Sequence, residues 1–403
     1  MKSFAEFTQA QPKPNLHMSH LDESIFEGGS AAAEDAIDAL LSLIEGDGQY
    51  DLTVKWDGSP SLFCGNDPAD GQFFVGTKSV FNANPKLYKT NEAIDANEPA
   101  GKATKLKESL RLLAKLNIPE GVVLQGDLLW TQGDHKYLTF ENTRYVTVHP
   151  NTLIYGWVAE SDIGHRVRNA ELGIVFHTQY TGNGALSSYT PTYGVDVSKL
   201  NSIPEVYVDD AYFKGKQVQV DPSVAHNIRE SVLQAREAID EADQLVSIMN
   251  NIPKSAIGAK IQTYYNTCIR EGYYPSADDY DQYVTYLKNY WMGRVVESVK
   301  TEKAKDSKMT QLKQLLDDMR LKERVFHNAF YYTQKINEAK TQIIEILNQA
   351  SAQKVFVNYD DVILEANHEG YCVINRDTNV SHKLVDRVTF SHNNFSETVK
   401  KGW

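Results

Sequence analysis

The sequence lacks the features of a membrane-spanning or disulfide-stabilised protein. Its 403 residues contain no run of about 18 apolar residues, the length that a transmembrane helix needs. Its three cysteines, Cys64, Cys268 and Cys372, lie far apart, which excludes a disulfide framework and a CxxC zinc site and fits a reducing cytosol. The first residues, MKSFAEFTQAQPKPN, have no apolar segment. We therefore expect no secretory signal, no membrane association and a cytoplasmic location.

Positive charge is also scarce. The chain has 41 Lys and Arg residues against 53 Asp and Glu residues, a formal net charge of −12 at pH 7. This balance excludes a uniformly basic nucleic-acid-binding protein, so a polyanion such as RNA or DNA would have to bind at a local patch. The clearest basic patch is residues 102–115, KATKLKESLRLLAK. Such a stretch is more often a solvated helix face than a binding surface.

Several common site motifs are missing. The sequence has no GxxxxGK[ST] or GxGxxG, which argues against P-loop and Rossmann nucleotide binding, and no GxSxG hydrolase elbow. Its histidines form neither HExxH nor a CxxC-linked set, so we expect no zinc site. The string HMSHLDE contains metal-binding residue types at His17, His20, Asp22 and Glu23. It has no helical or strand periodicity, and we interpret it as a loop.

What the chain does have is an ordinary globular composition, with 41% hydrophobic and 23% charged residues. Its length predicts two or three domains. Residues 31–46 predict an amphipathic helix that ends at a glycine. Residues 50–220 contain short apolar or alternating runs that predict strands, interrupted by one helix near 99–116. The predicted fold class is therefore α+β with a mainly antiparallel sheet.

The spacing of apolar residues changes near residue 222 and again near residue 351. Residues 223–350 have helical apolar spacing and predict a bundle of four to six helices, whereas strand-like runs return after Val355. A chain that leaves a β-rich domain and returns to it suggests an insertion. We therefore predict a β-rich domain formed by residues 1–222 and 351–403, with a helical insertion at 223–350. Three consecutive domains are the alternative.

The sharpest local signal is the string VKWDGSP. Lys55 stands at the end of an apolar strand, and Asp57 projects to the same face because side chains alternate along a strand. Gly58 permits a tight turn and a close approach of a ligand to the backbone. Partial burial would lower the pKa of Lys55 and make it a nucleophile. The alternative is a surface lysine that precedes an Asp-Gly turn.

The KWDG sequence resembles the KxDG nucleophile motif of the covalent nucleotidyltransferases, which include ATP-dependent DNA ligases, RNA ligases and mRNA-capping enzymes. The resemblance implies an antiparallel-sheet, ATP-grasp-like ligase domain that uses ATP and Mg²⁺. It implies that Lys55 attacks the α-phosphate of the nucleoside triphosphate and forms a lysyl–NMP intermediate. Asp57 would orient Lys55 and the nucleotide.

Further strings resemble later motifs of the same superfamily in the same order. VGTKSVF resembles the strand after the nucleophile motif and would place Lys78 on phosphate. LQGDLLW resembles the third motif, with Asp127 in place of the usual Glu, and Asp127 would bind metal or ribose. TLIYGWVAES resembles the next aromatic-rich strand, in which Tyr155 or Trp157 would pack on the base. The resemblance covers about residues 50–160 and 355–390.

The last two motifs lie near the C-terminus. HEGYCVI resembles the Glu-Gly motif and would make Glu369 a metal ligand, and SHKLVDRVTF resembles the final lysine motif, with Lys383 on phosphate. The 14-residue spacing of these two residues suits two adjacent strands joined by a turn. The final motif reads KLVDR and not Lys-x-Lys, so Arg387, on the same strand face, would replace the missing charge. Too few residues follow Lys383 for an OB-fold, which makes RNA ligases the better comparison.

These observations lead us to expect an ATP-dependent nucleotidyltransferase that resembles RNA and DNA ligases and transfers the nucleotide to a nucleic-acid end. Transfer to a protein or small molecule is a second possibility. The whole sequence also resembles an uncharacterised protein family of large tailed bacteriophages, which names no reaction and implies the host cytoplasm. A non-catalytic phage structural or assembly protein that retains the fold is the rival expectation.

Overall fold

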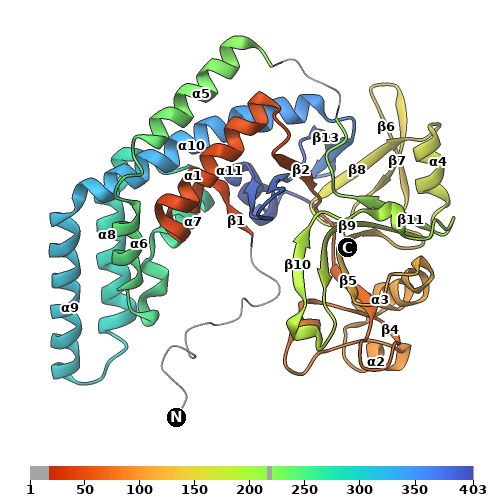
Figure 1. Ribbon diagram of the computed structural model, residues 1–403, viewed down its shortest axis with the longest axis horizontal. Coiled ribbons are helices and arrows are strands. Elements are labelled where there is room, and N and C mark those ends of the chain that lie inside the picture. The colour runs from red at the N-terminus through yellow and green to blue at the C-terminus, as the bar shows by residue number, and fades with distance from the viewer. Residues whose placement is uncertain (1–17, 216–219, 403) are drawn as a thin grey trace.

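Three antiparallel-rich sheets stand beside a layer of helices in the computed structural model, which describes residues 18–215 and 220–402 (Figure 1). Sheet I has the order β1-β15-β14-β2, from Ser19–His20, Ser381–Leu384, Gly370–Asn375 and Tyr50–Lys55. Sheet II has the order β10-β9-β5-β3-β4, from Thr190–Tyr193, Leu172–Thr181, Val122–Trp130, Ser61–Asn66 and Phe73–Gly76, and β11 (Val206–Asp210) also pairs with β9. Sheet III has the order β13-β12-β8-β7-β6, from Val362–Ala366, Lys354–Tyr359, Leu153–Val158, Thr143–Val148 and Lys136–Phe140. The predicted α+β class is confirmed.

The helices fall into two groups. Six α-helices follow one another in the central block of the chain, residues 222–350. They are α5 (Pro222–Arg236), α6 (Ala242–Asn250), α7 (Ile261–Arg270), α8 (Tyr280–Trp291), α9 (Glu302–Leu321) and α10 (Glu323–Ala350). The others lie among the strands: α1 (Ser24–Glu45), α2 (Asn91–Asp95), α3 (Ala100–Leu113), α4 (Asp162–Asn169) and α11 (Arg387–Phe395). The predicted glycine stop of the first helix is confirmed, because Gly46 caps α1 in the left-handed conformation. In the part of the chain that the structure describes, no helix has the length and apolarity to cross a bilayer.

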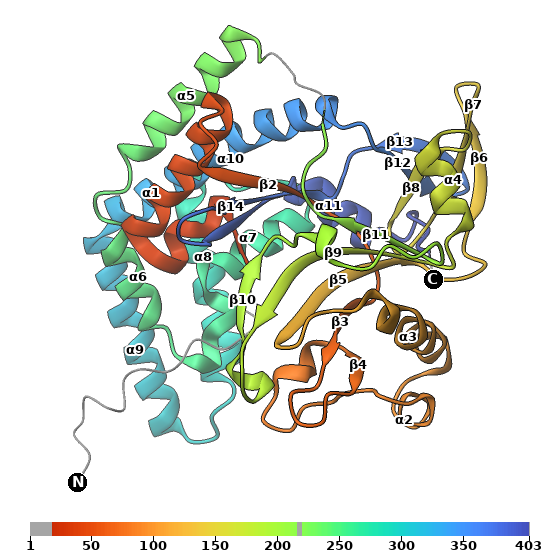
Figure 2. The ribbon, with the colours of Figure 1, turned by 45° about the vertical axis from the view of Figure 1, so that its right-hand side comes forward.

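The central helices do not pack only against one another. Their buried apolar residues form one continuous core with residues of α1 and of strands β2, β14 and β15. Figure 2 shows β2 and β14 lying between these helices and the β9–β5 sheet. In sequence the helical block separates β11 from β12, but in space its apolar faces bury one side of sheet I.

The C-terminal strands complete two sheets that the N-terminal half begins. Strand β12 pairs antiparallel with β8, and β14 pairs antiparallel with β2, with Gly370 opposite Lys55. The predicted hairpin of two adjacent strands near the C-terminus is confirmed, since β14 and β15 pair with Cys372 opposite Lys383. These pairings bring the last motifs of the chain beside the first.

Candidate functional site

A cleft between sheets I and II gathers residues from several of the predicted motifs. Its volume is about 250 Å³. Lys55, Asp127 and Lys383 line it from β2, β5 and β15, three strands that are far apart in the sequence. The other lining residues are Met18, Thr53, Val54, Trp56, Gln125, His177, Thr178, Tyr180, Tyr193, Ala211, Cys372 and Ile374. Two lysines and one carboxylate in a cleft with mainly apolar walls form a suitable environment for an anionic ligand that also has an apolar part.

Glu369 lies at the edge of this cleft and forms an ion pair with Lys55. The pairing of Gly370 with Lys55 sets Glu369 one residue before β14, next to the end of β2. Gly370 has a φ of 157°, and a Cβ there would lie 2.5 Å from the Leu384 carbonyl oxygen, so only glycine fits. The Glu-Gly pair of the motif therefore has a structural reason: the glycine allows the close approach that places the glutamate.

The ion pair keeps Lys55 protonated in the free protein. Burial lowers the pKa of Lys55, but the Glu369 carboxylate and smaller contributions from Cys372 and Asp127 outweigh burial and raise that pKa above its usual value. The expectation of a Lys55 activated by burial alone is therefore wrong. The pKa of Lys383, by contrast, is lowered by burial and by the positive charge of Lys55.

Both carboxylates beside Lys55 hold their protons more tightly than usual. Burial raises the pKa of Glu369 to about 7, against the opposing charge of Lys55, and it raises the pKa of Asp127 to about 7 in the same way. His177 Nε2 lies 3.8 Å from the Asp127 carboxylate. Burial and the charge of Lys55 lower the pKa of His177 to about 4, so at neutral pH this contact joins a neutral imidazole to a carboxyl and is not an ion pair. A cation that entered between Asp127 and Glu369 would relieve the cost of ionising both.

Asp57 does not face the cleft. Its buried carboxylate accepts hydrogen bonds from Asn151 Nδ2 at 2.7 Å, from the backbone N–H of Thr152 at 2.8 Å and from that of Leu153 at 2.9 Å. These donors occupy the carboxylate and tie the end of β2 to the start of β8. The expectation that Asp57 orients the nucleotide is not supported by this position; Asp57 is a clamp that fixes the chain immediately after Lys55.

The glycine of the KWDG string serves the same connection. A Cβ on Gly58 would lie 2.6 Å from the Asp127 Cβ and 2.9 Å from the Leu128 carbonyl oxygen. The next residue donates its backbone N–H to that same carbonyl at 2.9 Å. The chain after Lys55 can therefore pass directly over β5 only with glycine at position 58. This contact places Lys55 and Asp127 on facing sides of one cleft.

The two aromatic residues predicted to contact a base are both buried elsewhere. Tyr155 is fully buried, and its hydroxyl accepts the backbone N–H of Asp57 at 2.6 Å. Trp157 is 4% exposed and packs against Trp130, with ring centroids 5.8 Å apart. Neither lines the cleft, so the structure places both away from a base that would be bound there. Trp56, whose ring lies 4.7 Å from that of Tyr155, is the tryptophan that lines the cleft.

Arg387 also lies outside the cleft. Strand β15 ends at Leu384, and Arg387 is the first residue of α11, where it is 5% exposed. Its guanidinium pairs with Glu23 at 2.6 Å and Asp22 at 3.4 Å. The expectation that it shares a strand face with Lys383 is wrong, and the proposed role on phosphate has no support in this position, because its guanidinium is already paired with two buried carboxylates.

This buried charge network also accounts for the HMSHLDE string. Asp22 forms a second ion pair, with Lys340 of α10 at 2.7 Å, and both side chains are fully buried. The residues form a short 3₁₀ helix at Leu21–Glu23, and His17 lies outside the described residues. The interpretation as a loop is therefore wrong. The carboxylates of Asp22 and Glu23 form buried ion pairs with residues of α10 and α11.

Lys78 and the basic patch make no contribution to the cleft. Lys78 is exposed in a short 3₁₀ helix after β4 and does not line the cleft. Most cations of the patch on α3 are paired with carboxylates: Lys102 with Glu98, Lys107 with Asp95, Arg111 with Glu171 and Lys115 with Glu205. The patch therefore presents much less positive charge than its sequence indicates.

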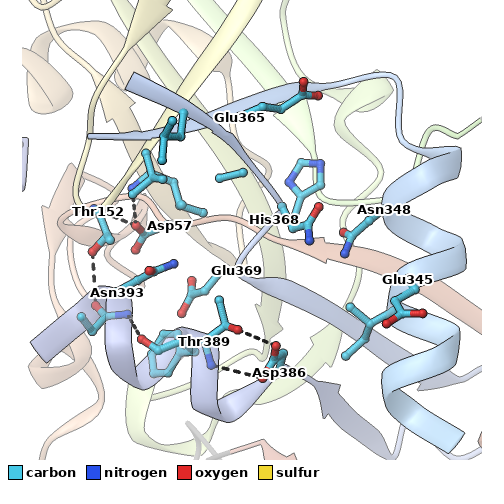
Figure 3. A pocket seen from close by; sticks show the side chains of 18 of the residues that line it. Asp57, Thr152, Glu345, Asn348, Glu365, His368, Glu369, Asp386, Thr389 and Asn393 are labelled. Atoms are coloured by element: carbon cyan, nitrogen blue, oxygen red, sulfur yellow. Dashed lines mark hydrogen bonds between the residues drawn. The ribbon is translucent and has the colours of Figure 1, made fainter. Parts of the chain in front are cut away.

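Glu369 also borders a second cavity, which is shown in Figure 3. Its volume is about 320 Å³, and its walls come from α10, β12, β13 and α11 and from the turn that holds Asp57. Glu369 lines this second cavity, whereas Lys55 lines the cleft. The ion pair therefore stands between the two spaces.

Three residues of β9 line the cleft without belonging to any of the predicted motifs: His177, Thr178 and Tyr180. The Tyr180 hydroxyl donates to Gln125 Oε1 on the neighbouring strand at 2.9 Å. The run GIVFHTQY predicts a strand. The polar residues near its end indicate that one face of this strand is polar. Which cavity that face meets depends on the pairing of β9 with β5.

Taken together, the fold and site define an α+β protein with a lysine–carboxylate cleft between two mainly antiparallel sheets. Residues 15–400 match the model of DUF6267, a family of unknown function, and the chain belongs to that family. Neither the curated proteins nor the solved structures contain a match to the chain.

Proposed function

We propose that the chain is a nucleotidyltransferase that binds a nucleoside triphosphate in the cleft and carries the nucleotide covalently on Lys55. The observation that carries the proposal is the convergence of Lys55, Asp127 and Lys383 on one cleft, with Glu369 paired to the Lys55 ammonium. These four residues are among those at which the sequence resembles motifs of the covalent nucleotidyltransferases. The ligase-like fold is part of the same proposal.

In the first step, the Lys55 Nζ lone pair forms a bond to the α-phosphorus. The bond between that phosphorus and the bridging oxygen breaks, and pyrophosphate leaves with the electron pair. Lys55 must lose a proton before it attacks, and Glu369, already paired with it, is placed to accept that proton. In the second step an acceptor oxygen bonds to the phosphorus, the P–N bond breaks, and Lys55 takes up a proton.

Two features of the cleft suit the charge of the substrate. Lys383 makes no ion pair with a carboxylate of the described residues, so its ammonium is available to a phosphate. Asp127 and Glu369 are the residues that would hold Mg²⁺, which binds through one or two carboxylates with phosphate oxygens and water. When bound, Mg²⁺ would offset negative charge on the phosphates.

Base recognition would fall to residues that the motif comparison does not name. Trp56 lines the cleft and offers an aromatic ring to a base. Gln125 and Thr178 supply hydrogen-bonding groups from β5 and β9. The resemblance proposes an RNA or DNA end as acceptor, but the paired cations of α3 lend it no support.

Incubation with α-³²P-labelled ATP or GTP and Mg²⁺, followed by a denaturing gel, tests the proposal. We expect an acid-labile, base-stable adduct. Lys55→Ala and Lys55→Arg should both abolish it, because arginine retains the positive charge but is not a nucleophile. Lys78→Ala should label like the wild type, because Lys78 is exposed and does not line the cleft. The proposal fails if wild-type protein is unlabelled by both nucleotides or if Lys55→Ala is still labelled.

One observation favours the rival proposal of a non-catalytic structural or assembly protein. Lys55 is protonated and paired in the free protein, which is also how a purely structural ion pair would look. Under this proposal Lys55→Ala would lower the melting temperature but wild-type protein would never form an adduct. The labelling experiment therefore separates the two proposals directly.

A further inference from the structure

The second cavity is larger than the cleft, and Glu369 of the reacting pair lines it. It is about 320 Å³, enough for roughly ten water molecules at about 30 Å³ each. Small-molecule sites in proteins begin at about this size. Glu369 stands at its inner end, and its carboxylate is 7% exposed.

The cavity carries a strong negative charge. Five carboxylates line it and, among the described residues, no lysine or arginine does: Asp57, Glu345, Glu365, Glu369 and Asp386. Figure 3 shows these groups coming from separate elements around the space. Burial lowers the pKa of His368 to about 4, so this imidazole adds no positive charge at neutral pH. Only a cationic or neutral ligand would be stable there.

These carboxylates differ in how far they are already neutralised. Glu365 is ion-paired with Lys354, and Glu369 with Lys55. Glu345 is exposed on α10 and makes no ion pair with a described residue, and Asp386 caps α11 by accepting the Thr389 backbone N–H at 3.2 Å. Asp57 also lacks a cation, but three hydrogen-bond donors already occupy its carboxylate, so Glu345 and Asp386 are the two that remain for a cationic ligand.

Two further observations indicate what the cavity can hold. The Lys55 ammonium, at its inner end, lies 5.5 Å from the centroid of the Phe390 ring and is paired with Glu369. One alkylammonium group, that of Lys55, is therefore already bound by a carboxylate and an aromatic ring of the cavity wall. This is the usual combination of partners for such groups. His368 is 8% exposed, lines the cavity, and its Nδ1 has no hydrogen-bond partner among the described residues. That nitrogen is a buried polar atom for which the described chain provides no partner.

We propose that this cavity binds a small alkylammonium compound, of the diamine or polyamine class, which competes with Lys55 for Glu369. Glu345 and Asp386 would hold the outer ammonium, Glu369 and Phe390 the inner one, and Ile344 and Leu364 would contact the methylene chain. A ligand ammonium on Glu369 releases Lys55 from its ion pair. The ligand then occupies the carboxylate that the proposed function uses as proton acceptor and Mg²⁺ ligand, so adduct formation should slow.

This regulatory part rests on the proposed function, since it takes Lys55 as the nucleophile; the binding part does not. Butane-1,4-diamine is a suitable probe, and butane-1,4-diol, which has a similar shape but no charge, is its matched control. Isothermal titration calorimetry at pH 8 without nucleotide measures binding alone. Wild-type protein should bind the diamine and not the diol.

Variants of the outer carboxylates test where the diamine binds. Glu345→Gln and Asp386→Asn should each weaken diamine binding about two- to fivefold, the range for exposed ion pairs, and asparagine retains the helix cap. Glu230→Gln, on the exposed face of α5 and outside both cavities, should bind like wild type. Equal affinity in all three variants, equal binding of the diol, or no binding of the diamine to wild type overturns the site.

A third arm distinguishes the sources of an alkylammonium group. N-acetyllysinamide presents the same group as a peptide side chain; if it binds through Glu345 and Asp386 more tightly than the diamine does, the small-molecule assignment is overturned. In the labelling assay at pH 7, saturating diamine should lower the rate of adduct formation several-fold. Binding without any rate change overturns the regulatory part. Absence of labelling in every condition overturns the proposed function and leaves the calorimetric result intact.

Discussion

The carboxylate of Glu369 lines one cavity, and the ammonium of Lys55, its ion-pair partner, lines the other. The pair is formed because β14 runs antiparallel to β2 with Gly370 opposite Lys55. Both groups are largely buried, and each influences the proton affinity of the other. Any ligand that attracts Glu369 therefore changes the reactivity of Lys55.

Replacing Glu369 with glutamine should shift the pH dependence of Lys55. The pKa of Lys55 is raised because the charge of Glu369 outweighs burial, so Glu369→Gln leaves burial and Lys383 to lower it. We expect the midpoint of the pH–rate profile for adduct formation to move down by about one pH unit or more, even if the maximal rate falls. The check is single-turnover labelling from pH 6 to pH 10. An unmoved midpoint would show that the pair does not control this amine.

Asp127→Asn should separate a ligand role from a structural one. Asparagine keeps the shape but loses the charge, so Mg²⁺-dependent nucleotide transfer should fall by about 10- to 1,000-fold. The pKa of Asp127 is raised from 3.8 to about 7, so the folded state binds this proton more tightly than the unfolded state does. The stability that this proton contributes is complete below about pH 4 and is lost as the pH rises through about 7.

The variant lacks that titration, so at pH 8 it should be more stable than wild type by about 1–3 kcal/mol, and the advantage should vanish at pH 4. Urea denaturation at the two pH values measures this difference. Unchanged transfer would remove Asp127 from the site, and a stability difference independent of pH would contradict the shifted titration.

Lys383 and Arg387 should respond in opposite ways to substitution. Lys383→Ala removes a cation from the cleft and should weaken nucleotide binding about 10- to 100-fold with little effect on melting temperature. Arg387→Ala leaves Glu23 and Asp22 buried near an empty space and should destabilise the fold by about 3–5 kcal/mol. Parallel thermal melts and equilibrium nucleotide binding measure both effects. A stable Arg387→Ala protein with weakened nucleotide binding would show that Arg387 contacts the nucleotide.

Asp57 should matter for stability more than for contact with the nucleotide. Asp57→Ala leaves the buried N–H groups of Thr152 and Leu153 without an acceptor, which should cost about 2–5 kcal/mol. Because the clamp holds the chain directly after Lys55, adduct formation should slow while nucleotide affinity of the folded fraction stays within about twofold of wild type. If nucleotide affinity fell by the same factor as the rate of adduct formation, Asp57 would instead be a direct contact of the nucleotide.

Much of the local structure could be predicted from the sequence. The alternating run VVLQGDLLW becomes β5, and the run around Lys383 pairs with the run around Glu369 as the expected hairpin. The helical spacing of residues 223–350 corresponds to six α-helices. These features follow from side-chain periodicity over neighbouring residues, and this information is present in a single sequence.

The same reasoning failed where a polar or aromatic side chain had more than one possible partner. Arg387 was expected on a strand, but Asp386 caps a helix that begins at Arg387. The signal, an Asp able to serve as an N-cap, was present in the sequence. Tyr155 was expected on a base, but it packs inside sheet III and accepts the N–H of Asp57. Nothing near Tyr155 in the sequence reveals that partner.

By itself the sequence determined the α+β class, the positions of most strands and helices, and the identity of Lys55, Asp127, Glu369 and Lys383 as candidates. Only the tertiary structure decided which of the candidates meet. The pairings of β14 with β2 and of β12 with β8 join segments from the two ends of the chain, and they bring Glu369 to Lys55 while Asp57 and Arg387 are bound by other partners. Periodicity reports which face of an element is buried, whereas the partner of that face depends on contacts between residues that are remote in sequence.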